Sequence, residues 1–138
     1  MEKEILLQFI AAINKHDLNA LSNLMADEHL FIDAHNNEVK GRDKMLAGWK
    51  FYFDWFPDYT IDVENILNNE SGFALFGFAE GTYHNLKAEG DKAHWRLPAA
   101  WKATVHNNKV SLWQVYADTM IPFEIINRYA LPAAKTIK

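Results

Sequence analysis

Asp33 and His35 are the two residues whose types and spacing are best suited to chemistry. They stand two apart in residues 29–35, a stretch with strand composition, so both side chains and that of Phe31 should point the same way. A carboxylate beside an aromatic-walled cavity loses hydration, which raises its pKa towards that of a useful general base. His35 could then orient Asp33 or donate to a developing oxyanion. In the alternative interpretation, Asp33 accepts backbone hydrogen bonds in the turn at Asn36-Asn37.

Asp118, at the end of residues 109–118, is a second candidate catalytic acid. This stretch follows an Asn-Asn turn and is rich in β-branched and aromatic residues, which is typical of a central strand. Asp118 also precedes Pro122, a residue that suits the first turn of a helix. The alternative role for Asp118 is therefore capping or turn stabilisation, which an Asp readily provides before a helix.

No residue pattern in the chain indicates a metal or a cofactor. Asp33 and His35 with a distant third ligand such as His84 would be the nearest approach to a metal site. The chain has no Cys, however, and its six His show no His-x-x-x-His or Glu-x-x-His pattern. His29 and His35 would stand roughly 20 Å apart on a strand that rises ~3.3 Å per residue. We therefore predict neither a cofactor nor a metal.

Length and composition limit the classes to which the chain can belong. With 138 residues, of which 49% are hydrophobic and 23% charged, it is predicted to form one domain over residues 1–138. A net charge of −4 argues against nucleic acid as a partner, because phosphate binding needs a basic stripe. No apolar run approaches the ~20 residues of a membrane span, and the N-terminus lacks an apolar signal core. We expect a cytoplasmic protein with no nucleic-acid or membrane partner.

The hydrophobic period changes from about 3.6 to 2 residues along the chain, which predicts helices followed by strands. A helix is expected over residues 2–14, a second between Asp17 and Asp27-Glu28, and a third between Gly41 and Pro57. After the strand at 29–35, further strands are expected at about 59–68, 72–86, 92–106 and 109–118, with turns at Asn68-Asn69, Gly90-Asp91 and Asn107-Asn108 and a closing helix from Pro122 to Pro132. Short turns between long strands predict an antiparallel meander.

Two of the predicted strands have faces of different character. Along residues 92–106 one face is apolar and should point inward, and it consists of Trp95, Leu97, Ala99, Trp101, Ala103 and Val105. On the last strand, Leu112, Gln114 and Tyr116 form an outer face that is amphipathic rather than charged. Such a face suits a contact between two copies of the chain, so we predict a homodimer.

The order and spacing of four short motifs resemble those of SnoaL-like polyketide cyclases. The motifs are residues 9–21, Gly41-Arg42-Asp43, Phe56-Pro57-Asp58 and residues 108–118. This family belongs to the nuclear transport factor 2-like superfamily, together with ketosteroid isomerases and limonene epoxide hydrolases. The resemblance covers nearly the whole chain and implies an α+β cone. In that cone three N-terminal helices pack on a curved antiparallel sheet, a short C-terminal helix follows, and a cavity opens at the wide end.

The resemblance transfers little of the catalytic machinery of these enzymes. Asp33 matches the proton-shuttling carboxylate of ketosteroid isomerases, but their oxyanion-hole acid falls near Trp101. The acid that cyclases and epoxide hydrolases carry on the last strand falls on Val115, which cannot take a proton. The Arg-x-Asp pair of the epoxide hydrolases has no counterpart in residues 80–84. No complete catalytic set is therefore implied.

These observations together predict a small-molecule-binding protein with a mostly apolar cavity and a small hydrophobic ligand. If it is an enzyme, Asp33 would move a proton next to a carbonyl group without a cofactor, assisted by His35 or Tyr83. The alternative is a non-catalytic ligand-binding or association module of the same fold. Large aromatic residues serve as core and as cavity wall alike. The predicted lining is Phe31, Trp49, Phe53, Tyr83, Trp95, Trp101, Trp113 and Val115, with Ala117 completing the inward face of the last strand.

Overall fold

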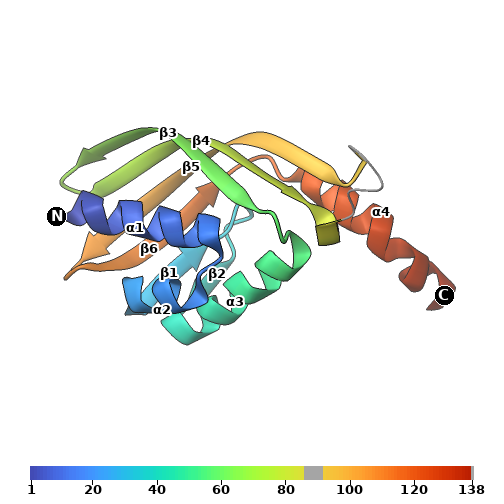
Figure 1. Cartoon of the computed structure of the whole chain (residues 1–138), viewed down its shortest axis with the longest axis horizontal. Helices are drawn as coiled ribbons and strands as arrows, with labels where there is room; N and C mark the ends of the chain where they lie inside the picture. The colour runs from blue at the N-terminus through green and yellow to red at the C-terminus, as the bar shows by residue number, and fades with distance from the viewer. Residues whose placement is uncertain (86–91, 138) are drawn as a thin grey trace.

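A computed structural model of the chain describes residues 1–85 and 92–137, which form helices packed against one curved six-stranded sheet (Figure 1). This arrangement confirms the predicted α+β class. The predicted turn at Gly90-Asp91 lies outside the described residues. The elements in chain order are α1 (Glu2–Lys15), α2 (Leu18–Leu24), β1 (Met25–Ile32), β2 (Glu38–Lys40), α3 (Arg42–Trp55), β3 (Thr60–Asn69), β4 (Gly72–Thr82), the 3-10 turn η1 (Tyr83–Asn85), β5 (His94–His106), β6 (Lys109–Tyr116) and α4 (Met120–Ile137).

The first helices form where the sequence predicts them. Helix α1 buries Leu6, Phe9 and Ile13, which repeat at helical spacing on the side that faces the sheet. Asp17 caps α2, since its carboxylate accepts the amide hydrogen of Ala20 at 3.0 Å. The predicted end of α2 at Asp27-Glu28 is wrong. The helix ends at Leu24, because the chain already enters the sheet at the next residue.

The sheet has the strand order β2-β1-β6-β5-β4-β3. Strands β3 to β6 are neighbours in sequence and pair antiparallel, which confirms the predicted meander. Strand β1 lies beside β6 and pairs with it in parallel, so the sheet is mixed rather than wholly antiparallel as predicted. A parallel pair needs a long connection, and here almost the whole chain between β1 and β6 supplies it.

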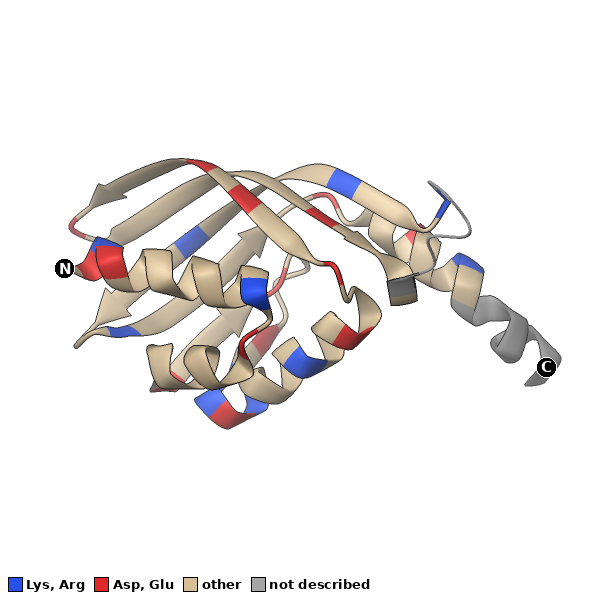
Figure 2. Ribbon diagram, in the orientation of Figure 1, with Lys and Arg blue, Asp and Glu red and all other residues tan. Residues whose placement is uncertain are grey.

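The inner face of the sheet is apolar along its longest strand. All six residues of β5 that alternation assigned to the inside are buried, as predicted. Helices α1 and α3 cover part of this concave face, and α4 lies at one end of the sheet (Figure 1). Figure 2 shows acidic residues in red and basic residues in blue distributed over several helices and strands. None of the helices in the described part of the chain has the length and apolar character of a membrane span.

Helix α4 is longer than predicted. It runs over Met120–Ile137 and does not end at Pro132. A proline inside a helix removes one backbone hydrogen bond without forbidding the turns on either side. Asp118 precedes the helix, and its carboxylate accepts the amide hydrogen of Met120 at 3.0 Å. Asp118 thus takes the capping role that was the alternative to catalysis.

His29 bridges β1 and β6 where their register shifts between Met25 and Leu30. Its imidazole is fully buried, and its Nδ1–H donates to the carbonyl oxygen of Val110 at 2.7 Å. Its Nε2 has no hydrogen-bond partner among the described residues. Burial lowers the pKa of His29, and the bond to Val110 offsets this only in part. The buried ring therefore stays neutral where an exposed histidine would take up a proton.

This histidine should make the fold sensitive to acid. Because its folded-state pKa lies below the unfolded value of about 6.5, its full contribution to stability is present above that pH and is lost as the pH falls. Protonation of one such group lowers the free energy of unfolding by at most about 1.4 kcal/mol per pH unit. His29→Gln, which keeps a donor towards Val110, should flatten the decline in unfolding free energy as the pH falls below about 6.5. His106→Gln, at an exposed site, is the control for urea melts over this range, and equal slopes for all three proteins would contradict the assignment.

Candidate functional site

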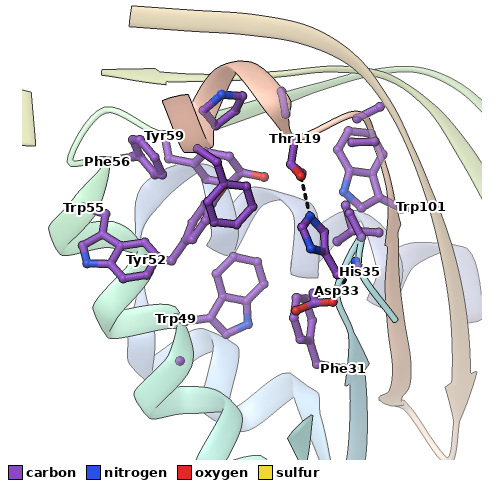
Figure 3. A pocket seen from close by; sticks show the side chains of 18 of the residues that line it. Phe31, Asp33, His35, Trp49, Tyr52, Trp55, Phe56, Tyr59, Trp101 and Thr119 are labelled. Atoms are coloured by element: carbon purple, nitrogen blue, oxygen red, sulfur yellow. Dashed lines mark hydrogen bonds between the residues drawn. The ribbon is translucent and has the colours of Figure 1, made fainter. Parts of the chain in front are cut away.

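A cavity of about 270 Å³ lies between the concave face of the sheet and the helices α3 and α4. The turn after β1, the inner faces of β5 and β6, and the first turns of α4 complete its wall. Figure 3 shows the labelled aromatic residues of α3 on one side and Phe31, Asp33 and His35 on the other. Two elements distant in sequence, the β1–β2 turn and α4, therefore meet across one end of the cavity.

All five tryptophans of the chain line this cavity. Trp101 and Trp113, on adjacent strands, stack with ring centroids 6.1 Å apart and an interplanar angle of 26°. Trp49 comes from α3 and packs edge-on against Phe31 at 6.4 Å. The remaining two are Trp55, which is partly exposed at the end of α3, and Trp95 on β5. Flat, weakly polar surfaces of this kind suit a ligand that is itself flat and apolar.

Asp33 lines the cavity, but its carboxylate is mostly occupied in the turn that follows β1. Oδ1 accepts the amide hydrogens of His35 at 2.9 Å and of Asn37 at 2.8 Å, and Oδ2 accepts the Asn37 side-chain amide at 3.2 Å. Asn36 adopts a left-handed conformation with φ 67° between them. These contacts form the turn that the sequence offered as the alternative role for Asp33.

His35 joins this turn to the start of α4. Its Nε2 lies 2.7 Å from the hydroxyl oxygen of Thr119, and its ring lies 5.2 Å from that of Phe123. His35, Thr119 and Phe123 all line the cavity, and Figure 3 shows the contact between His35 and Thr119 at its edge. Asp33, His35 and Thr119 thus form one polar group at this end of the cavity.

Most of the predicted lining residues reach the cavity, and three predicted site residues do not. Phe31, Trp49, Trp95, Trp101, Trp113 and Val115 line it, as does Ala117. Phe53 lies one turn beyond Trp49 and stacks on His16 at 3.9 Å, so it faces α1 instead. Tyr83 leaves the strand in η1 and packs behind Phe56 at 6.0 Å, and exposed Asp118 caps α4.

Tyr52, Phe56 and Tyr59 are lining residues that the sequence analysis missed. Tyr52 lies within the predicted third helix, and Phe56 belongs to the motif Phe56-Pro57-Asp58. Tyr59 stands two residues before the buried Ile61. Because side chains alternate between the two faces of a strand, this spacing indicated that Tyr59 points inward. Pro122, Phe123 and Ile126 of α4 also line the cavity, and these could be assigned only once the position of α4 was known.

A hydrogen-bond network fixes the turn that carries Phe56 and Tyr59. The carboxylate of Asp58 accepts the backbone amide of Thr82 at 2.6 Å and its hydroxyl at 2.7 Å. His94 Nδ1 lies 2.8 Å from the same hydroxyl oxygen. Close packing adds to this, because a Cβ at Gly81 would lie 3.0 Å from Cβ of Phe56. The turn is therefore tied to β4 and β5, and Tyr59 is held in place against the cavity.

Burial affects the two tyrosines of the cavity in the same way. It raises the pKa of Tyr59 well above its ordinary value, with a further contribution from Tyr52, and it raises the pKa of Tyr52 as well. Both therefore remain neutral phenols. Their hydroxyl groups have no hydrogen-bond partner in the described part of the chain. The described residues contain no group of three or more metal-ligating side chains placed to hold an ion.

The sequence profile of the SnoaL-like domain matches residues 6–118 of the chain. No curated protein matches it in sequence. Among solved structures, IdmH, a candidate polyketide cyclase from Streptomyces antibioticus, superposes with a TM-score of 0.73 at 18% identity, covering 92% of this chain and 99% of its own. An LEH-like epoxide hydrolase from M. tuberculosis has a TM-score of 0.73 at 10% identity, covering 98% of this chain and 91% of its own.

A third similar structure is that of a hypothetical protein from Catenulispora acidiphila in complex with trimethylamine, which has a ketosteroid isomerase-like fold. It has a TM-score of 0.73 at 16% identity and covers 86% of this chain and 88% of its own. At these identities the three structures support the fold and not a shared activity.

Proposed function

The chain belongs to the SnoaL-like domain family, and from this premise we propose that it binds a small, flat, mostly apolar molecule in the cavity between α3 and the sheet. The observation that carries the proposal is the wall itself, in which all five tryptophans of the chain surround one space. Aromatic rings that only filled a core would leave no such volume between them.

The size of the cavity limits the ligand. An apolar cavity of about 150 Å³ holds one benzene ring, and ordinary ligand sites begin near 300 Å³. A volume of about 270 Å³ therefore suits a molecule of about two fused rings. Asp33, His35 and Thr119 lie at one end, so most of the ligand would contact apolar and aromatic side chains.

The geometry supports binding better than catalysis. The carboxylate of Asp33 already accepts three hydrogen bonds within its own turn, so most of its lone pairs are engaged there rather than with a ligand. Val115 contributes an apolar contact on the last strand, and Asp118 does not reach the cavity. A binding protein of this family needs no proton acceptor, whereas an enzyme of the predicted type would.

Filling part of the cavity should weaken binding without unfolding the protein. Ala99 points into the cavity from β5, so Ala99→Leu should weaken the binding of naphthalene about tenfold or more by occupying part of its volume. Binding is measured by calorimetry, with the protein titrated into naphthalene. Ala100→Leu is the matched control. Ala100 is the next residue of β5, and its side chain points to the opposite face of the sheet from that of Ala99. Equal affinity in both variants, or no binding by the unaltered protein, would refute the proposal.

Proton transfer next to a carbonyl group is the second candidate function. It is favoured by one observation, that Asp33 and His35 line the cavity together at its polar end. Oδ2 of Asp33 accepts a single hydrogen bond, at 3.2 Å, and so keeps a lone pair for a proton. In this reaction the carboxylate takes a proton from the carbon beside the carbonyl and the resulting enolate takes it back, without net change in charge.

Deuterium uptake tests this second candidate. In D₂O the protein should accelerate exchange of the methyl protons of 2-acetylnaphthalene, followed by NMR, over the rate without protein. Asp33→Asn keeps an acceptor for the turn but removes the base, so the acceleration should fall by about 100-fold or more. Asp118→Asn should retain the activity, because Asp118 lies outside the cavity. No acceleration by the unaltered protein would leave binding as the function.

We also propose that two copies of the chain associate through the outer face of the sheet. Three large apolar side chains are exposed there: Leu67 at 61%, Phe76 at 44% and Tyr116 at 52%. With Lys102 they line one shallow depression on β3 to β6, which gives the face an apolar centre with a polar rim. Because a twofold contact pairs the same patch with itself, such a self-complementary face suits a homodimer.

A charge at the centre of this face should separate the copies. Light scattering at micromolar concentration should give twice the chain mass for the unaltered protein and one chain mass for Phe76→Glu, since a carboxylate cannot be buried unpaired in the contact. Phe51→Glu is the control, as Phe51 is similarly exposed but lies on α3. A single-chain mass for the unaltered protein would contradict the proposal.

A further inference from the structure

We propose that the ligand carries a hydrogen-bond-accepting oxygen of the carbonyl type, and that Tyr59, with Tyr52 beside it, receives this oxygen at the α3 side of the cavity. The inference rests on the proposed binding function and adds the polarity of the ligand and its direction in the site. It gives Tyr52 and Tyr59 a role in ligand specificity, although neither was a candidate catalytic residue in the sequence.

The ring of Tyr59 is held from several sides, so its hydroxyl has a defined position. Its backbone amide donates to the carbonyl of Phe56 at 2.9 Å, and its own carbonyl lies 2.7 Å from Nε2 of His16. Its ring meets that of Tyr52 at 90° with centroids 4.8 Å apart, and that of Trp95 at 6.1 Å. A donor fixed in this way loses little conformational freedom when a ligand binds.

The hydroxyls of Tyr52 and Tyr59 differ from the other unpartnered polar groups of the interior. The indole nitrogens of Trp49 and Trp95 lack a partner among the described residues, and they are sealed by surrounding atoms. The two tyrosine hydroxyls also lack a partner there, but they are not sealed. Because both tyrosines line the cavity and Tyr59 is only 7% exposed, the space open to its hydroxyl is the cavity.

Both phenols act as donors to the ligand. Burial raises the pKa of each, so each keeps its proton at neutral pH. A neutral hydroxyl in a poorly hydrated site gains most from a strong neutral acceptor, and a carbonyl oxygen has two lone pairs for this purpose. A carboxylate ligand would lose more hydration than such a site returns.

The opposite end of the cavity disfavours the same oxygen. There the carboxylate of Asp33 presents lone pairs, and a ligand carbonyl beside it would meet electrostatic repulsion. Figure 3 shows Tyr52 and Tyr59 on the side away from Asp33 and His35. Repulsion at Asp33 and donation by the tyrosines therefore both favour a ligand whose acceptor lies towards Tyr59.

A matched pair of probes tests the inference. 2-Acetylnaphthalene and 2-isopropenylnaphthalene have nearly the same shape, but only the first has an acceptor oxygen. The unaltered protein should bind the acetyl compound about 3- to 10-fold more tightly than its hydrocarbon partner, the range expected for one neutral hydrogen bond. Tyr59→Phe should remove this preference while leaving affinity for the isopropenyl compound unchanged, and Tyr52→Phe should reduce it.

Two further measurements separate the hydrogen bond from indirect effects. The carbonyl stretching band of bound 2-acetylnaphthalene should shift to lower wavenumber in the unaltered protein and return towards its free position in Tyr59→Phe. Tyr83→Phe is the control, since Tyr83 is buried but lies outside the cavity. Equal affinity for the two probes, or an equal loss for both in Tyr59→Phe, would overturn the inference. Failure to bind either probe would instead overturn the binding function on which it rests.

Discussion

The packing of aromatic rings across the concave face of the sheet is the interaction on which the rest of the interior depends. Phe9 of α1 contacts Trp113 at 5.1 Å and Trp49 at 6.5 Å, and Trp113 stacks with Trp101 at 6.1 Å. These contacts join a helix from the start of the chain to strands from its end. Phe9 lies behind this layer in the core, whereas the three tryptophans also face the cavity. The same rings thus close the core on one side and form the ligand wall on the other, so the cavity keeps its shape because the core is full.

Local patterns determined most of the fold that could be predicted. The period of Leu6, Phe9 and Ile13 and the capping acid at Asp17 act within one turn of helix, and the alternation along β5 acts within one strand. What the sequence did not reveal depends on contacts between distant segments. The parallel pairing of β1 with β6 includes a register shift that the side chain of His29 spans, and no local pattern encodes a partner 81 residues away. The extent of α4 was missed because Pro132 was taken as a stop, a rule that local propensity supports only as a tendency.

The site was predictable to a similar degree. The alternation of side chains along a strand predicted that Phe31, Asp33 and His35 lie on one side of the strand end, and they do line the cavity together. This alternation could not show that the carboxylate of Asp33 accepts hydrogen bonds from the amides of His35 and Asn37, because those bonds depend on the geometry of the turn. Phe53 and Trp49 lie one turn apart on the same helix, yet one stacks on His16 and the other faces the ligand space. Helical spacing gives a broad face, and the neighbouring helix determines which part of that face is covered.

The distribution of polar atoms around the cavity explains how a wall made mostly of tryptophan can still be selective. Apolar contact is nearly indifferent to the details of a flat ligand, because every ring system of suitable size buries a similar area. A polar group discriminates more strongly, since a buried donor left unpaired by the wrong ligand costs about 1–3 kcal/mol. In this cavity the sealed indoles of Trp49 and Trp95 carry that cost whatever is bound, so they cannot distinguish ligands. The hydroxyl of Tyr59 is open to the cavity, and its cost is removed only by a ligand with an oxygen at that point. The few polar atoms at the ends of the cavity therefore discriminate between ligands, whereas the tryptophans between them supply most of the affinity.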